Sequence, residues 1–106
     1  MNKAPIIIAE DSPFLTNETR QTRWAIPYNF ECLNARIYNL LTRNQNCIKG
    51  KRILDIGSHM GTFMYAALEL GADFVQGIDT EEKTIERGQD LFRELQVSQF
   101  SYKLLI

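Results

Sequence analysis

The sequence predicts an α/β fold in which the parallel strands of one sheet alternate with flanking helices. Short apolar runs occur at 52–56 and 74–79 and again near the end of the chain. Between these runs lie two segments whose apolar residues recur at helical spacing. The order strand, helix, strand, helix, strand favours parallel strands that are joined by right-handed crossovers. We therefore expect an open sheet of about three strands.

The composition fits one small globular unit. The chain has 106 residues, of which 44% are hydrophobic and 24% charged, and its formal net charge is -1. Acids and bases are mixed along the chain, so charge gives no sign of a nucleic-acid partner. No apolar run is long enough for a signal peptide or a membrane span, and Cys32 and Cys47 lack metal-site spacing. We expect a cytoplasmic protein without a membrane partner and without a metal.

Residues 1–27 are expected to form an extended or turn-rich arm. All three prolines of the chain lie here, and each biases its neighbour away from the helical conformation. The isoleucines at 6–8 should attach the arm to the rest of the protein. In residues 28–48 the helical spacing of apolar residues predicts an amphipathic helix from Tyr28 to Arg43 that packs on or caps the sheet. Its inward residues are Phe30, Leu33, Ile37, Leu40 and Leu41.

Residues 49–106 form the predicted sheet. After a turn at 49–51, the run 52–56 is expected to be a buried strand, and the glycine-bearing stretch 57–61 opens a helix that Gly71 ends as a C-terminal cap. The second strand is 74–79, and Thr80 is the expected N-cap of the next helix. Gly88 weakens the middle of that helix by roughly 1 kcal/mol relative to alanine. Residues 100–106 are the third strand.

Two acids and a glycine turn form a predicted ligand site at the carboxyl ends of the first two strands. Gly57 and Gly61 let the chain reverse sharply and let a ligand approach the backbone. Asp79 stands 24 positions after Asp55 and can accept hydrogen bonds from both ribose hydroxyls. Because Thr80 is expected to cap the helix, we expect the Asp79 carboxylate to be free for this role. This layout is typical of a site for an adenosyl ligand.

The segments ILDIGSHMGTF (53–63) and VQGIDTEE (75–82) resemble the first two signature motifs of class I S-adenosylmethionine-dependent methyltransferases. The KGKRILDIG context at 49–57 strengthens this resemblance, which extends to about residue 95. It implies a Rossmann-like domain, of which about the first half is present, and S-adenosylmethionine as the cofactor. It also implies that Asp55 organises the methionine-amino end and that Asp79, beside Thr80, holds the ribose. The methionine portion would be wrapped by Gly57, Ser58, His59, Met60 and Gly61.

His59 departs from the family pattern, because it stands where the family most often has its middle glycine. A dinucleotide fingerprint G-x-G-x-x-G is broken at both His59 and Thr62, which makes a nicotinamide-dependent oxidoreductase the less favoured interpretation. His59 is expected to line the ligand through its backbone rather than to act in catalysis. The sequence identifies no catalytic residue and no acceptor substrate.

The resemblance also implies later strands that carry the adenine pocket and the substrate motif, and the chain reaches only its third strand at Ile106. We therefore expect one of two arrangements. The chain is either the cofactor-binding part of a longer methyltransferase, or a non-catalytic S-adenosylmethionine-binding module that a partner chain or a second copy completes. An unpaired apolar sheet edge favours association with another chain.

Overall fold

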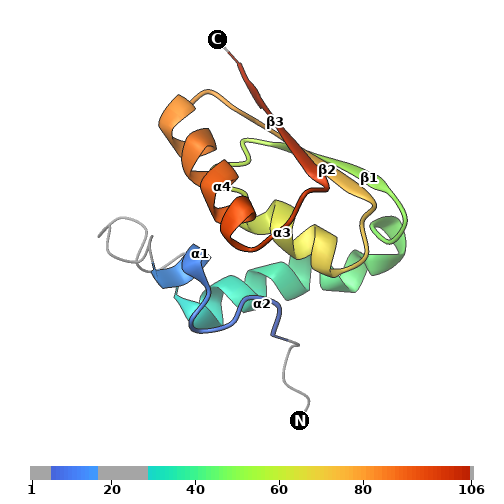
Figure 1. Ribbon diagram of the computed structural model, residues 1–106. Helices are drawn as coiled ribbons and strands as arrows, with labels where there is room; N and C mark the ends of the chain where they lie inside the picture. Colours follow the sequence, from blue (N-terminus) through green and yellow to red (C-terminus); the bar gives the residue numbers. More distant parts are fainter. Residues whose placement is uncertain (1–5, 17–28, 106) are drawn as a thin grey trace.

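The computed structural model describes residues 6–16 and 29–105, and within them three strands form one parallel sheet. Strands β1 (Arg52–Ile56), β2 (Phe74–Asp79) and β3 (Phe100–Leu104) lie in the order β1-β2-β3, with β2 in the centre (Figure 1). Both pairs of neighbouring strands are parallel. The predicted parallel sheet of three strands is confirmed, and β3 ends two residues before the predicted boundary.

The sheet has a covered face and a bare face. Helices α3 (Thr62–Glu69) and α4 (Glu82–Glu94) both lie on the same side of the sheet (Figure 1). On the other side the β1 side chains Leu54 and Ile56 are 53% and 75% exposed. The prediction that β1 is a buried strand is therefore wrong for this face, because β1 is an edge strand and no described element covers it.

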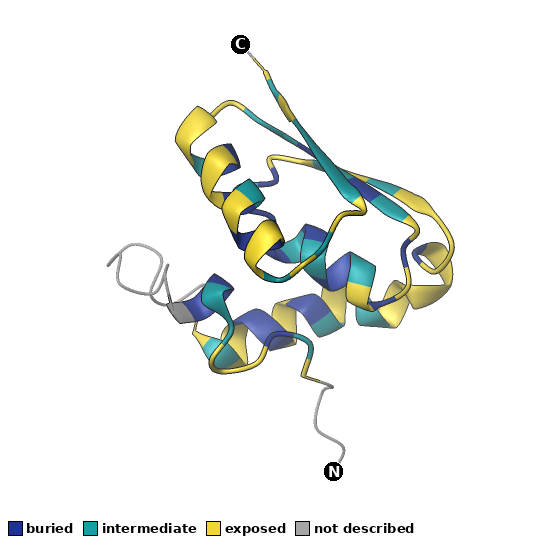
Figure 2. Cartoon of the chain, viewed as in Figure 1, coloured by how far each residue is buried: buried dark blue, intermediate teal, exposed yellow. Residues whose placement is uncertain are grey.

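The core lies between the covered face of the sheet and the helices, where the buried residues gather in Figure 2. Phe92 on α4 is at its centre and is fully buried. Its ring centroid lies 4.5 Å from that of Phe100 and 6.2 Å from that of Tyr102, both on β3. Phe14 contacts the same ring in an edge-on arrangement at 5.9 Å. These aromatic contacts join α4, β3 and the N-terminal segment.

The N-terminal segment 6–16 is packed on the protein. The Asn34 side-chain oxygen accepts hydrogen bonds from the N–H groups of Ile7 and Ile8, and its nitrogen donates to the Ile8 carbonyl. The short helix α1 (Pro13–Thr16) then buries Phe14. Residues 6–12 have the irregular, turn-rich backbone that was expected, and the isoleucines attach this part to the protein as expected; only the short helix at 13–16 was not expected. Residues 17–27 lie outside the described part.

Helix α2 (Phe30–Leu40) is shorter than predicted. Asn29 is its N-cap, and the Asn29 side chain accepts hydrogen bonds from two backbone N–H groups of the first turn. The chain continues after Leu40 as the 3₁₀ segment η2 (Thr42–Cys47). Leu33 and Ile37 are buried and Leu41 packs against the core as predicted, whereas the prediction that Leu40 points inward is wrong, since Leu40 is 59% exposed. The predicted start at Tyr28 lies outside the described residues.

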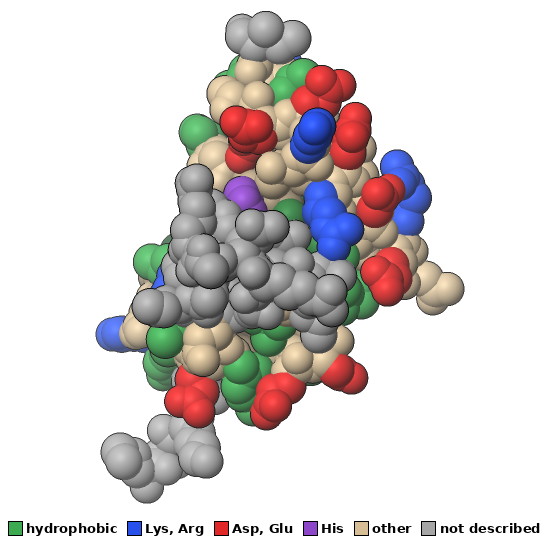
Figure 3. Space-filling view, turned by 90° about the vertical axis from the view of Figure 1, so that its left-hand side faces the viewer, with side chains coloured by type: hydrophobic (Ala, Val, Ile, Leu, Met, Phe, Trp, Pro, Cys, Tyr) green, Lys and Arg blue, Asp and Glu red, His purple; other side chains and the backbone are tan. Residues whose placement is uncertain are grey.

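The remaining elements follow the predicted pattern closely. Gly71 has φ +102° directly after the last turn of α3, as expected of a C-terminal cap. The inward residues Ile85, Leu91 and Phe92 of α4 are buried. Acidic and basic side chains are interspersed over the molecular face in Figure 3. None of the helices formed by 6–16 and 29–105 has the length and apolar character that crossing a bilayer requires.

Candidate functional site

The structure brings the two predicted acids to the same edge of the sheet. Asp55 is the fourth residue of β1 and lies opposite Gly77 of β2, and Asp79 is the last residue of β2. The stretch Gly57–Gly61, called the ligand turn below, follows β1 and leads directly into α3. Because the strands are parallel, their carboxyl ends and the start of α3 meet at this edge.

Hydrogen bonds tie the ligand turn to the end of β2. The N–H groups of Gly57 and Ser58 donate to the Ile78 carbonyl at 2.8 and 3.1 Å. The His59 N–H donates to Oδ2 of Asp79 at 2.8 Å. Asp79 therefore fixes the conformation of the ligand turn in addition to its predicted role.

The second oxygen of Asp79 also has a partner, which corrects the prediction made for Thr80. Oδ1 accepts a hydrogen bond from the Glu81 N–H at 3.0 Å, and Glu81, not Thr80, is the N-cap of α4. The chain stays extended through Glu81, so the Asp79 carboxylate lies within reach of the first N–H groups of the helix. Since a carboxylate offers about four lone-pair positions, the backbone N–H groups leave part of its acceptor capacity for a ribose hydroxyl.

The same contacts set the charge of Asp79. Partial burial acts to raise the pKa of its carboxyl, but the backbone N–H groups of Glu81, His59 and Thr80 outweigh burial and leave the pKa below its usual value. Hydrogen bonds to the charged form stabilise that form. Asp79 is consequently ionised at neutral pH.

Asp55 has the opposite environment. Burial raises the pKa of its carboxyl, and the negative charge of Asp79 raises it further. The site therefore holds an ionised acid beside a second acid whose negative charge is disfavoured by burial and by Asp79. A positively charged group would relieve this repulsion.

The backbone of the ligand turn adopts conformations that favour glycine. Gly57 has φ +76°, and within 6–16 and 29–105 no atom outside the adjoining residues lies within 4 Å of the position that a Cβ would take, so these residues leave the backbone open there. Gly61 has φ +93° and is the N-cap of α3. His59 lies in the left-handed region as well, with φ +55°. This conformation is the physical reason that a glycine suits the position of His59.

Two residues of the predicted site point their side chains inward. Ser58 and Met60 are 5% and 1% exposed. The Met60 side chain belongs to the core, and that of Ser58 lies against Gly77 beneath the turn. Only the backbone atoms of these two residues can therefore contact a ligand. Gly57 and Thr80 are the exposed residues of the predicted site, and Asp55, His59 and Asp79 are half-buried.

Three residues that were not among the predicted site residues support the ligand turn, and the sequence did not assign them this role. A Cβ on Gly77 would lie 2.5 Å from Met64 Sδ and 2.6 Å from Ser58 Oγ, so the turn and α3 rest directly on β2. Gly88 and Tyr102 lie against the far end of the turn. A glycine inside a strand or a helix is the sequence signal for such close approach.

Replacing Gly77 by alanine is expected to lower the free energy of unfolding by about 1–3 kcal/mol, the usual cost of overpacking a core. The added methyl group would displace Ser58 and Met64. Chemical denaturation followed by circular dichroism measures the change. Gln76→Ala is the matched control, because Gln76 is the neighbouring β2 residue and lies on the bare face. Equal effects of the two substitutions would contradict the close approach at Gly77.

Replacing His59 by glycine is expected to leave the free energy of unfolding within about 1 kcal/mol of the natural protein or to raise it, since glycine adopts φ +55° without steric cost. His59→Val should lower it by about 1–2 kcal/mol, the cost of the left-handed region for a side chain with a branched Cβ. Thermal or chemical unfolding of the two variants tests this contrast. A valine variant as stable as the glycine variant would contradict it.

No family model matches the sequence, and no curated protein matches it. Solved structures do match. A candidate RNA methyltransferase from Pyrococcus horikoshii has a TM-score of 0.60 and 23% identity, over 67% of this chain and 37% of that protein. An S-adenosylmethionine-dependent methyltransferase from Mesorhizobium loti has a TM-score of 0.50 and 26% identity, over 60% of this chain and 30% of that protein.

A third match is the tRNA (uracil-54, C5)-methyltransferase of Pyrococcus abyssi, which was solved in complex with S-adenosylhomocysteine. Its TM-score is 0.54 and its identity 25%, over 69% of this chain and 18% of that protein. The chain thus spans about a third or less of the length of these proteins. The described residues have the Rossmann-like fold of class I S-adenosylmethionine-dependent methyltransferases over the matched part.

Proposed function

We propose that this chain is the cofactor-binding part of an S-adenosylmethionine-dependent methyltransferase. The observation that carries the proposal is the pair of acids beside the open backbone of Gly57. Asp79 is ionised, and burial and the charge of Asp79 both disfavour a negative charge on Asp55. S-adenosylmethionine offers two positive groups, a sulfonium and an ammonium, together with ribose hydroxyl donors. Such a ligand complements the charge and the hydrogen-bonding capacity of this edge.

Different residues of the site would bind different parts of the cofactor. The remaining acceptor capacity of Asp79 would receive the ribose, and Asp55 would face the ammonium group. The open backbone at Gly57 and the free N–H groups at the start of α3 would receive the methionine portion, since a helix N-terminus favours a carboxylate. When bound, the cofactor supplies a methyl group on a positively charged sulfur. The residues of this chain bind and orient it.

The same features disfavour a dinucleotide. The phosphates of NAD would bring negative charge to a turn that already lies beside Asp55 and Asp79, and these repel anions. His59 also occupies a position where the dinucleotide fingerprint requires a glycine. We therefore place S-adenosylmethionine ahead of NAD as the ligand.

Isothermal titration calorimetry with S-adenosylmethionine, S-adenosylhomocysteine and NAD tests the proposal. We expect binding of both sulfur-containing ligands at one site per chain and no binding of NAD. Binding of NAD together with no response to the other two ligands would overturn the proposal. A buffer titration and a titration with adenosine separate recognition of the methionine portion from recognition of the nucleoside.

A second candidate is a non-catalytic module that another chain completes, and the bare face of the sheet favours it. Leu54 and Ile56 are exposed there on the unpaired edge strand. Cofactor binding without methyl transfer to any of a panel of acceptors would favour this candidate. A cytoplasmic location belongs to the same proposal, supported by the exposed free cysteines Cys32 and Cys47, which a reducing compartment preserves.

A further inference from the structure

We propose that Tyr102 is a positioning residue for the ligand turn. Its hydroxyl oxygen is buried between Gly61, the last residue of the turn, and Gly88 in the middle of α4. The position of the turn relative to α4 is set by this contact. The consequence for ligand affinity rests on the proposed function, whereas the consequence for the conformation of the turn does not.

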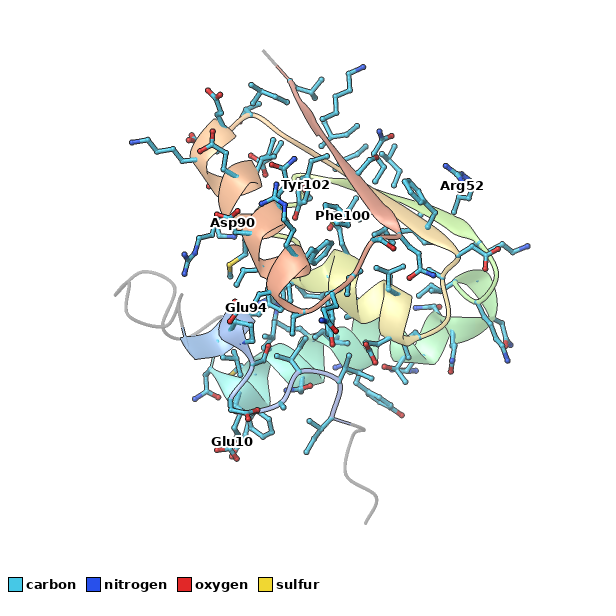
Figure 4. The ribbon with its side chains drawn as sticks, in the orientation of Figure 1. Glu10, Arg52, Asp90, Glu94, Phe100 and Tyr102 are labelled. Carbon is cyan, nitrogen blue, oxygen red and sulfur yellow. The ribbon has the colours of Figure 1, made fainter. Side chains whose placement is uncertain are left out.

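Tyr102 belongs to the row of residues that crosses the sheet beneath the site. Asp55 of β1 pairs with Gly77 of β2, and Gly77 pairs with Tyr102 of β3. The Tyr102 side chain points from β3 towards the helices (Figure 4). Its oxygen is the first atom that a Cβ on Gly61 or on Gly88 would meet, and either Cβ would overlap it. Both glycines therefore make room for the same hydroxyl group.

Helix α4 also touches the turn directly at this point. A Cβ on Gly88 would lie 2.6 Å from the Met60 carbonyl oxygen, so the backbones of α4 and the turn are in close contact. This contact explains why a glycine stands inside a helix at a cost of roughly 1 kcal/mol relative to alanine. The end of the turn is held on one side by Gly88 and on the other by Tyr102.

The Tyr102 hydroxyl is held in place by aromatic packing around its ring. The Tyr102 ring packs against Phe92 at 6.2 Å and against Phe100 at 5.9 Å between ring centroids. Phe92 is fully buried, so the ring has little freedom to move. Gly61 in turn precedes the first N–H groups of α3. A shift of the hydroxyl would move the part of the turn that receives the methionine portion of the ligand.

The variant Tyr102→Phe removes one oxygen atom and keeps the ring. We expect it to bind S-adenosylhomocysteine about three- to ten-fold more weakly, the range that follows when one buried heavy atom and its packing contacts are removed. We also expect the backbone amide resonances of 58–61 to shift in the ligand-free protein, as measured by ¹⁵N–¹H correlation spectra. An unchanged dissociation constant with unchanged resonances at 58–61 would overturn the proposal.

Phe100→Leu is the matched control, because Phe100 lies two residues away on β3 and packs against Phe92 at 4.5 Å. A purely structural residue should lower the melting temperature and leave the affinity for S-adenosylhomocysteine unchanged. We expect this behaviour for Phe100→Leu. For Tyr102→Phe we expect a lower affinity and an unchanged melting temperature. Equal losses of affinity in the two variants would assign Tyr102 to general packing and overturn the proposal.

A double-mutant cycle with Gly88→Ala tests the shared contact. The methyl group should displace Tyr102 and Met60 and weaken ligand binding on its own. In Gly88→Ala/Tyr102→Phe the missing oxygen gives the methyl group space, so the combined loss should be smaller than the product of the two single losses. A combined loss equal to that product would contradict the contact. If the natural protein binds no S-adenosylhomocysteine, the proposed function fails, and the amide shifts at 58–61 still decide the role of Tyr102.

Discussion

Replacing Asp79 by alanine is expected to weaken S-adenosylmethionine binding by at least ten-fold. Loss of a hydrogen bond to a charged group costs about 1.5–3 kcal/mol, which corresponds to about ten-fold or more in affinity. The variant also loses the anchor of the His59 N–H and the bond to the Glu81 N–H. The ligand turn would therefore loosen in addition to the loss of the ribose acceptor.

Calorimetry on purified variants measures this effect. Asp90→Ala is the matched control, since Asp90 lies on the outer surface of α4 and is 70% exposed in its pair with Arg93. Asp79→Asn keeps one oxygen acceptor and removes the charge, so it shows how much of the loss comes from charge. An Asp79→Ala variant with the affinity of the natural protein would rule out the assigned role.

Replacing Asp55 by asparagine should have two opposite consequences. Cofactor affinity should fall by about ten-fold or more, because an interaction between the carboxylate and the ammonium group is charge-assisted. The ligand-free protein should become more stable at pH 7, because the variant no longer buries a negative charge beside Asp79. Chemical denaturation and calorimetry measure the two quantities. Asp73→Asn, an exposed acid before the amino end of β2, should change neither.

The pH dependence provides an independent check on Asp55. Its folded-state pKa is raised, so its contribution to stability is present below the unfolded-state pKa and is lost as the pH rises through the folded-state value. Binding of a cationic ligand requires the ionised form. Affinity should therefore fall as the pH drops through the raised pKa, and this fall should be absent in Asp55→Asn. The same pH profile in both proteins would contradict the assignment.

Local sequence patterns were sufficient to predict the elements of the sheet. The apolar runs at 52–56 and 74–79 match β1 and β2, and the helical spacing after Gly61 matches α3. The meeting of Asp55 and Asp79 at one edge also follows from sequence, because the carboxyl ends of parallel strands share an edge. These features depend on residues that are near one another in the chain.

Contacts between distant residues were not predictable in the same way. The Asn34 amide holds Ile7 and Ile8 across more than 25 positions, and Tyr102 lies against Gly61. Nothing in the local pattern specifies these partners. The expected cap at Thr80 failed for a local reason instead, since the Asp79 carboxylate accepts a hydrogen bond from the Glu81 N–H two residues later and the helix begins after Glu81. The sequence indicated only that Gly88 destabilises α4. The structure explains why a glycine stands there, because α4 packs directly on the ligand turn at this residue.

The most direct test of the site is a titration with S-adenosylhomocysteine followed by ¹⁵N–¹H correlation spectra. If one ligand contacts both the ligand turn and Asp79, the amide resonances of 57–61 and 80–81 should shift together along a single binding curve. Shifts in only one of these two segments, or in neither while other residues respond, would contradict a common site.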